Sequence, residues 1–598
     1  MFGINKRVVT ILFGLLALAF VVGAILLFTP QAGQEAKGKP VLWVNGKAVY
    51  ELDLLRLQGN DPLYAANPQG LLKVLVDTHF LEQVILTEAL RQDAARIRVG
   101  SAEVRKEVER IREQFGLKDK KAYEQFLNQV GYTDAQLRAE IKAQLQIQKR
   151  LEQVRSAAKP TPEEVRFYFE VHQEDYQTEP RVLARQIVVD DKKVAEEVLA
   201  KAKAGEDFAA LAKQYSKVGA EQGGALGAAP GESAPKPVTR VVFPEKVAEA
   251  VFALKGPGLV GPIEAGGRYY LVQVEAYLPP KVPTFEEVKD QVEKDAAEAK
   301  ANGALEAYLE DLRKKAQVRF AEDMPYTYKN PAVAKVNGKE ILLSQVLQPV
   351  FANQQTAALI QQGLGELAVQ FFLPQTLESL IDRELLVEAA KKSGKPFIGT
   401  KDEIAQAYLL YETRDVAATE AEARKFYAEN PAFFTIPASA EVVGVVFQEE
   451  AKAKAFREAA LKASDLQALA RAHGGSVTEY GTVNPNQLPA VLDRLVFKVK
   501  ETFPKGPLGE VSEVVKLEDG TFAVLLVKNR KPEELKPFEA VKEEALQGVK
   551  NRKRQEKAQD LLQKLRQQAQ IENRLAQVLA ELTPKTEEKP QEEAPTNP

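Results

Sequence analysis

The sequence predicts a multidomain α+β protein in which one order of helices and strands occurs twice behind an apolar N-terminal segment. The chain has 598 residues, too many for one hydrophobic core, because domains usually hold ~100–200 residues. A long apolar run lies near the N-terminus, at residues 8–28. Several sequence landmarks of the body return in the same order in its second half, as duplicated architectures require.

The apolar N-terminal run is long enough to cross a membrane. It extends from Val8 to Phe28, is interrupted only by Thr10, and follows Lys6 and Arg7. Roughly 20 helical residues span a ~30 Å hydrocarbon core. The residues after Phe28 match a small-x-small cleavage site poorly, which favours an uncleaved anchor over a signal peptide.

The two basic residues predict the orientation of this anchor. Positive charges favour the cytoplasmic side, so residues 1–37 are expected to form a cytoplasmic stub, a transmembrane helix over 8–28 and a linker. The rest of the chain would then lie in the periplasm, as part of a single-pass protein of the inner membrane.

The composition excludes several classes of function. The chain carries 81 basic and 84 acidic residues, without the basic excess of a nucleic-acid binder. It has no cysteine, which excludes disulfides and thiolate metal sites, and its histidines lack metal-binding spacing. We therefore expect no metal, cofactor, small-molecule ligand or nucleic acid. The three histidines are His79, His172 and His473.

The duplication begins with a strand that enters an Asn-Gly turn. This pattern occurs at residues 41–47 and again at 333–339. Helix-period sequence follows each copy, and each copy later contains a Thr-capped, aromatic helix. Those helices begin at Thr161 and Thr419, and each leads into an extended apolar stretch, at 182–189 and 442–447.

The remaining landmarks also come in pairs. Asp207 and Asp465 each open a short helix that precedes a Gly-Gly pair, and β-rich runs follow at 269–274 and 522–527. A long charged helix closes each copy. The tail at 583–598, rich in Pro, Glu, Lys and Thr, is expected to be disordered.

The α+β unit of the first copy resembles the parvulin family of peptidyl-prolyl isomerases. The resemblance rests on 183–189, Gly205–Ala212, Tyr215-Ser216, Gly223–Gly227, 250–254 and Gly261-Pro262. It covers residues 181–279, and residues 438–531 look like a second, degenerate parvulin-like domain.

The flanking helices with the Asn-Gly-Lys hairpin resemble the SurA, PpiD and PrsA group of foldases. In that group, a helical chaperone module is built from segments on both sides of the parvulin domain. The resemblance implies a first helical module at 38–180, completed by 284–318. It implies a second at 330–435, completed by 536–582.

The resemblance also implies an isomerase site with altered polar positions. An X–Pro bond rotates over a barrier of ~18–20 kcal/mol, and an apolar, shape-matched pocket lowers it by favouring the less polar twisted amide. Active parvulins add two histidines and a Cys or Asp. The histidine positions correspond to Gln186 and Tyr269, and the Cys/Asp position lies nearest Val218.

The apolar positions of that site are better preserved than the polar ones. The residues expected to grip proline are Phe243, Val247 and Phe252. In the second copy the two histidine positions fall at Gly444 and Phe522. The resemblance therefore leaves reduced isomerase activity open for the first domain and implies little more than the fold for the second.

Structural roles compete with these functional interpretations. Phe252 and Tyr269 can be ordinary packing residues, and His79 lies in an apolar helical pattern typical of a core position. The aromatics at 167–169 fit a core stripe of a helix, although one side of that helix could line a groove for clients.

Three functions remain open from sequence alone. The first is a membrane-anchored foldase that holds unfolded or newly translocated polypeptides, with the membrane and a translocon as partners. The second is an active isomerase that uses residues 181–279. The third is an envelope scaffold that docks onto one fixed protein partner.

Overall fold

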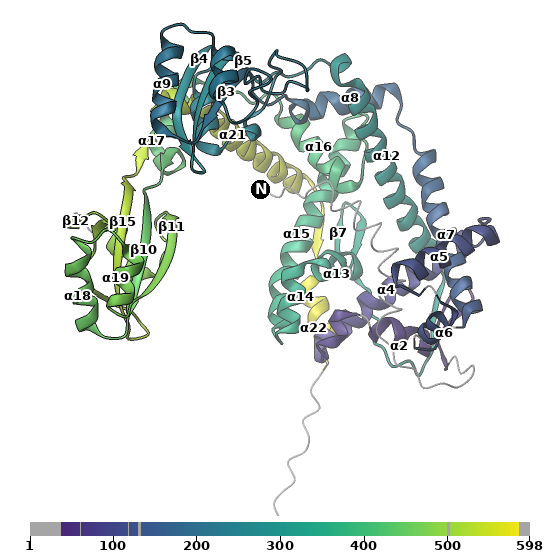
Figure 1. The fold of residues 1–598 in the computed structure, drawn as a ribbon. Helices are drawn as coiled ribbons and strands as arrows, with labels where there is room; N and C mark the ends of the chain where they lie inside the picture. The colour runs from purple at the N-terminus through teal and green to yellow at the C-terminus, as the bar shows by residue number, and fades with distance from the viewer. Residues whose placement is uncertain (1–37, 60, 118, 130–132, 499–502, 585–598) are drawn as a thin grey trace, which may run out of the picture. The chain divides into compact units, whose positions relative to one another are not determined.

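The computed structural model describes residues 38–59, 61–117, 119–129, 133–498 and 503–584 (Figure 1). The described chain forms two compact units, one containing residues up to 414 together with those from 557 onward, and the other residues 415–556. No helix within the described ranges is both long and apolar enough to span a bilayer. The expected anchor at 8–28 and all but two residues of the expected disordered tail lie outside those ranges.

The first unit begins with a helical module that has a small sheet at its base, here called module 1. Strand β6 (Val318–Phe320) pairs with β1 (Pro40–Val44), which pairs with β2 (Lys47–Tyr50). The long helix α12 (Phe285–Lys315) packs against α4, α7 and α8. The helices before it are α2 (Glu51–Gly59), α3 (Pro62–Ala65), α4 (Gly70–Ala94), α5 (Ser101–Gln114), α6 (Lys120–Gln129), α7 (Asp134–Ala157) and α8 (Pro162–His172).

Module 2 repeats this plan within the same unit. Strand β17 (Ile571–Asn573) pairs with β7 (Ala332–Val336), which pairs with β8 (Lys339–Leu342). Its helices are α13 (Leu343–Ala352), α14 (Gln354–Gln361), α15 (Gly365–Lys392), α16 (Lys401–Thr413), α22 (Leu575–Leu582) and the last turns of α21 (Phe538–Gln568).

The asparagine of each Asn-Gly turn forms hydrogen bonds with the residue directly before the third strand of its sheet, β6 in module 1 and β17 in module 2. Asn45 lies at φ +49°, and its side-chain oxygen accepts the backbone N–H of Gln317 (2.8 Å), while its own N–H donates to the Gln317 carbonyl (2.8 Å). Asn337 holds Gln570 in the same way, with both distances 2.9 Å. Asparagine suits this position because it tolerates left-handed backbone and its amide mimics a peptide group.

Modules 1 and 2 share one hydrophobic core. Leu72, Leu75 and Val76 of α4 are buried in a cluster with residues of β7, α13, α14, α15 and α22. His79, one turn further along α4, meets the ring of Phe351 edge-to-face at 5.2 Å. Helix α4 therefore belongs to both modules.

A second contact joins the same modules at α12. Ile398 is buried among side chains of α8 and α12, and the N–H of Lys401 donates to the Glu306 carboxylate of α12 (2.7 Å). Gly303, inside α12, faces Gly399, where any Cβ on residue 303 would collide with the Gly399 carbonyl. A glycine in a helix interior costs ~1 kcal/mol relative to alanine, and this backbone contact explains its presence.

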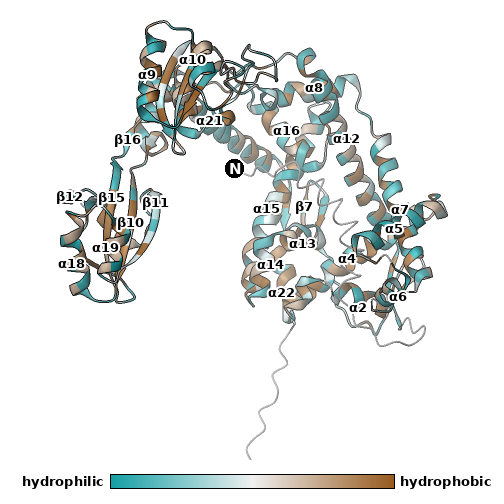
Figure 2. Cartoon of the chain, in the orientation of Figure 1, coloured by the Kyte–Doolittle hydropathy of each residue, from teal (hydrophilic) through white to brown (hydrophobic). Residues whose placement is uncertain are grey.

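The first α+β domain contains an antiparallel sheet covered on both faces. Its strand order is β3 (Arg181–Val189), β5 (Arg268–Leu278), β4 (Gly258–Ala265). Helices α9 (Lys192–Lys203) and α10 (Phe208–Tyr215) cover one face, and α11 (Glu245–Ala253) covers the other. Hydrophobic residues are concentrated on its strands (Figure 2).

The second unit contains the other α+β domain. Its sheet has the order β11 (Ser476–Val483), β10 (Ser439–Phe447), β15 (Phe522–Lys531), β13 (Gly509–Val511), β12 (Lys505–Gly506), and β14 (Val515–Lys516) also pairs with β15. Its helices include α17 (Glu420–Glu429), α18 (Glu450–Ala460), α19 (Leu466–Ala472) and α20 (Ala490–Asp493). A short ribbon of β9 (Thr435–Ile436) and β16 (Glu534–Leu535) leads into this sheet.

The helices that flank the two α+β domains are held by equivalent ion pairs. Lys300 of α12 pairs with Glu164 of α8 (2.5 Å), and Lys553 of α21 pairs with Glu422 of α17 (2.6 Å). Both glutamates also complete the capping box of their helix, which begins after a threonine in each case. The duplicated sequence landmarks therefore correspond to duplicated contacts.

Candidate parvulin-type site and its eroded copy

One face of the first α+β domain carries the apolar part of the candidate site. Phe243, Val247 and Phe252 pack in one cluster with Val272 and Tyr270 of β5. Phe243 follows the short 3-10 helix η2 (Arg240–Val242), and Val247 and Phe252 lie on α11. We call this side of the sheet, covered by α11, the pocket face.

Gln186 points to the pocket face. It pairs directly with Val272, and it lies two residues from Ala184, which is buried in the same cluster. Residues that lie two apart on a strand share a face. The Gln186 backbone N–H donates to the Gly224 carbonyl (2.8 Å), so the loop after α10 covers the outer edge of β3. The neutral Gln186 amide can donate to or accept from a substrate carbonyl or N–H.

The structure corrects the expectation for Tyr269. This residue pairs with Val189 and packs with Leu211 on the α9–α10 face, opposite Gln186 and Phe243. Desolvation and the neighbouring Glu264 raise the pKa of the Tyr269 hydroxyl. Tyr269 therefore cannot form a polar site together with Gln186.

Tyr270 occupies the pocket face in place of Tyr269. It pairs with Val188, on the same face as Gln186, and belongs to the cluster of Phe243 and Phe252. Tyr269 and Tyr270 are adjacent in the sequence, and the resemblance assigned the histidine position to Tyr269. Only the strand register separates them, since a shift by one residue reverses the face.

Val218 lies apart from the apolar cluster. It is 40% exposed and belongs to neither cluster of the domain. The Ser216 hydroxyl beside it donates to the Val218 carbonyl (2.7 Å) and accepts the Val188 N–H (3.1 Å), which fixes the loop to β3. The structure thus brings Gln186, Phe243, Val247 and Phe252 to one face and leaves Val218 and Tyr269 outside it.

The second α+β domain has the same strand register, and a tyrosine covers the position that corresponds to Gln186. Gly444 pairs with Leu525 as Gln186 pairs with Val272, and Ala523 occupies the position of Tyr270. A Cβ on Gly444 would lie 2.9 Å from the Tyr480 ring, so this ring covers the position. Phe522, like Tyr269, packs on the opposite face, in the cluster covered by α18 and α19.

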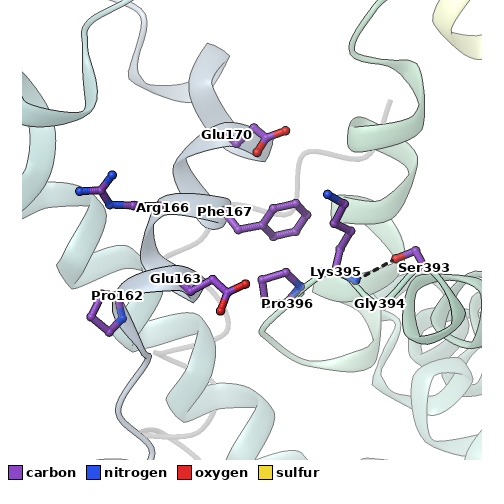
Figure 3. Close-up of a pocket in the computed structure, with 9 residues that line it drawn as sticks. All are labelled: Pro162, Glu163, Arg166, Phe167, Glu170, Ser393, Gly394, Lys395 and Pro396. Carbon is purple, nitrogen blue, oxygen red and sulfur yellow. Dashed lines mark hydrogen bonds between the residues drawn. The ribbon is translucent and has the colours of Figure 1, made fainter.

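A separate hollow lies where α8 meets the loop before α16. Its volume is about 710 Å³, and Figure 3 shows Phe167 directed between the two segments toward Lys395. The Phe167 ring also meets Phe397 edge-to-face at 4.9 Å and Tyr411 at 5.4 Å. Helix α8 therefore both packs against module 2 and lines this hollow. The hollow is lined by Pro162, Glu163, Arg166, Phe167, Glu170, Ser393, Gly394, Lys395 and Pro396.

Family models match most of the chain in separate segments. A SurA-like N-terminal domain matches residues 3–151, and a PPIC-type PPIase domain matches residues 160–290 and again 418–543. Within the described residues, no group of three or more His, Cys, Asp or Glu side chains is placed to hold a metal ion.

Curated relatives are foldases. The chain is 30% identical over 209 residues to foldase protein PrsA of Caldanaerobacter subterraneus subsp. tengcongensis, a match that covers 34% of this chain and 63% of the relative. It is 30% identical over 219 residues to foldase protein PrsA 3 of Bacillus anthracis, covering 36% of this chain and 66% of the relative. The chain thus spans slightly less than two thirds of the length of these relatives.

Solved structures also match parts of the chain. A SurA-like chaperone chain of Campylobacter jejuni, from work on PEB4 and Cj1289, is 13% identical, with a TM-score of 0.24; the match covers 48% of this chain and all of that one. PrsA from Bacillus anthracis is 21% identical, with a TM-score of 0.17, and 39% of this chain matches 96% of it. By these domain matches, the chain belongs to the SurA-like group of parvulin-domain proteins, with two copies of the PPIC-type PPIase domain.

Proposed function

We propose that this protein is a membrane-anchored, extracytoplasmic chaperone that holds unfolded or newly translocated polypeptides. The family of its domains supports a foldase role. The apolar run at 8–28 supports an anchor in the inner membrane with the folded part in the periplasm. Clients would be bound without nucleotide, through apolar surface and shape.

The observation that carries this proposal is an exposed apolar rim beside the pocket face. Val241 is 81% exposed and Val242 is 46% exposed, and both directly precede the buried Phe243. Exposed apolar side chains that continue a buried apolar cluster are typical of binding surfaces. An extended client segment could cover this rim while a proline side chain contacts the partly buried Phe252.

The polar side chains of the pocket face indicate weak isomerase activity at most. Gln186 and Tyr270 can form hydrogen bonds to a substrate but replace the histidines of active parvulins. A hydrogen bond made only to the twisted amide contributes ~1 kcal/mol, or about a factor of five in rate. We therefore assign holding of clients as the main activity.

Suppression of client aggregation tests this assignment. The full chain in lipid nanodiscs is mixed with a chemically denatured client at equal molar ratio, and light scattering is followed. The wild type is expected to delay aggregation, and Val241→Ser with Val242→Ser is expected to shorten the delay severalfold. Val282→Ser, at another exposed valine (44%), is the matched control. A wild type without any delay would refute the proposal.

An active isomerase is the second candidate, because Gln186 and Tyr270 share the pocket face with the apolar cluster. Acceleration of a proline-limited refolding reaction would establish it. That acceleration should fall in Gln186→Ala and Tyr270→Phe and persist in Tyr269→Phe, while holding activity persists in all three.

The anchor requires its own test. Deletion of residues 1–37 should move the protein from the membrane fraction to the soluble fraction. Protease added outside the inner membrane should degrade the body of the full-length chain. Retention of the deleted form in the membrane would contradict the proposed anchor.

A further inference from the structure

The contact between modules 1 and 2 has an inserting side and a receiving side. The inserting side is the N-terminal half of α4, with Leu71, Leu72 and Leu75. The receiving side is formed by α13, α14 and the start of α15, where Leu347 is fully buried. Leu72 fits so closely that a Cβ on Gly365 would lie 2.5 Å from its methyl group.

Equivalent ion pairs fix which residues correspond between the two modules. Glu82 of α4 pairs with Arg313, and Glu378 of α15 pairs with Arg566. Equivalent positions of α4 and α15 are therefore 296 residues apart in the sequence. Lys47 pairs with Glu88, and Lys339 pairs with Glu384. Equivalent positions of the two hairpins are therefore 292 residues apart in the sequence. The sequences of α2 and α13 follow these hairpins directly.

Two of the three inserting positions are exposed in module 2, whereas Leu72 corresponds to Ala368, which is 2% exposed. By the spacing of 296, Leu71 corresponds to Leu367 and Leu75 to Phe371. Leu75 is fully buried, whereas Phe371 is 60% exposed and Leu367 is 62% exposed. Leu364, one turn before Leu367, is 42% exposed and extends the same apolar stripe.

The part of the receiving side of module 1 that lies on α2 is exposed as well. By the spacing of 292, the fully buried Leu347 of α13 corresponds to Leu55 of α2, which is 46% exposed. Leu52, one turn earlier on α2, is 38% exposed. Among the described residues, an apolar face on α2 and an apolar face on α15 are therefore left exposed.

We propose that the α15 face of one copy of this chain docks onto the α2 face of a second copy. The contact would repeat the one that α4 makes with module 2 inside each chain. Contacts between unlike faces of identical chains are heterologous and extend into rings or open arrays. Because both complementary faces belong to the same chain, a second copy fits them better than an unrelated helix. This inference does not depend on the proposed function.

Site-specific crosslinking in whole cells tests this docking, and the absence of native cysteine makes the labelling selective. Two differently tagged full-length chains are co-expressed, one with Leu52→Cys and the other with Leu367→Cys. Both positions lie at the rim of their faces. A short, membrane-permeant bismaleimide is added to whole cells, and the mixed dimer is quantified by its two tags.

A mixed dimer is expected only when both cysteine variants are present. Adding Phe371→Glu to the Leu367→Cys chain, or Leu55→Glu to the Leu52→Cys chain, should reduce the yield at least about tenfold, since each places a charge in an apolar contact. Val491→Cys, at a 40% exposed valine of the other unit, replaces either cysteine as the control and should give background yield.

Three results would overturn the proposal. These are a mixed yield no higher than that of the Val491→Cys control, a dimer formed equally well by one cysteine variant alone, and a yield unchanged by both glutamate substitutions. Crosslinking of Leu367→Cys to a denatured client in place of a second copy would assign the α15 face to client binding and likewise exclude self-docking.

Discussion

Acidification is expected to destabilise the shared core of modules 1 and 2 through His79. The imidazole is nearly buried between α4 and the Phe351 ring, and the Gln83 amide donates to its Nε2 (2.8 Å). Burial lowers the pKa of His79 from 6.5 to about 4, although the nearby Glu82 opposes this shift. Protonation would place an N–H on Nε2, where it faces the Gln83 donor, and would leave a charge in an apolar site.

The direction of the effect follows from the lowered pKa. Between pH 6.5 and about 4 the unfolded chain binds a proton at His79 and the folded chain does not. The contribution of the neutral His79 imidazole to the free energy of unfolding is therefore fully present above pH 6.5 and is lost as the pH falls toward 4. At a pH of about 4.5 the loss amounts to about 2.5 kcal/mol, from ~1.36 kcal/mol per pKa unit.

Urea unfolding followed by fluorescence provides the assay. The only tryptophan, Trp43, lies in β1 of module 1 beneath the Arg319 guanidinium, so its emission reports on this module. The wild type and His79→Gln are unfolded at pH 7.5 and at pH 4.5. The pH-dependent change in unfolding free energy should be about 2.5 kcal/mol smaller in His79→Gln, because other titrating groups are common to both.

A histidine in the other unit serves as the control. His473→Gln should leave the pH dependence of the Trp43 transition unchanged. If wild type and His79→Gln lost equal stability on acidification, the buried imidazole would not be the cause, and the reasoning from its pKa would be refuted.

Four further results follow from the contacts described above. Gly303→Ala should release the start of α16 from α12, visible as faster amide hydrogen exchange at 401–404; unchanged exchange would mean that α12 accommodates the Cβ. Asn337→Ala should destabilise the β7–β17 pairing by about 1–3 kcal/mol, and Asn337→Gly by somewhat less because it keeps the left-handed backbone; exchange at 571–573 measures both. If the first domain catalyses proline isomerisation, Gln186→Ala should slow it about fivefold, whereas an equal effect of Tyr269→Phe would contradict the assignment of faces. Gly444→Gln should destabilise the second unit by about 1–3 kcal/mol because Tyr480 occupies that space, and thermal unfolding of Gly444→Gln with Tyr480→Ala should show partial recovery.

The duplicated motifs made the repeated plan predictable from sequence. The Asn-Gly turns and Thr-capped helices are local signals, since their residues determine turn and cap geometry over a few positions. Both sets of motifs occur at equivalent places in the structure. The roles of Asn45 and Asn337 in holding distant strands could not be predicted, because Gln317 and Gln570 carry no matching local signal.

The candidate site was predictable only in part for a related reason. The apolar residues Phe243, Val247 and Phe252 lie in one cluster, as packing of amphipathic segments favours. Tyr269 was misplaced because sequence motifs do not fix strand register to one residue. The shared core also escaped sequence reasoning, since Leu72 and Leu75 fit any buried helix face, and their partners lie more than 250 residues away.

The Asn45 contact with Gln317 has a consequence for the order in which the chain can fold. Strand β6, the partner of β1, is separated from it in the sequence by an entire α+β domain. Strand β17, the partner of β7, is separated from it by the other α+β domain. During synthesis each α+β domain is complete before the module that encloses it can close its sheet, and long-range strand pairing is slow. Until then β1 and β2 remain a two-stranded hairpin, which is marginally stable alone, and the nascent protein itself presents unfinished edges of the kind that chaperones shield.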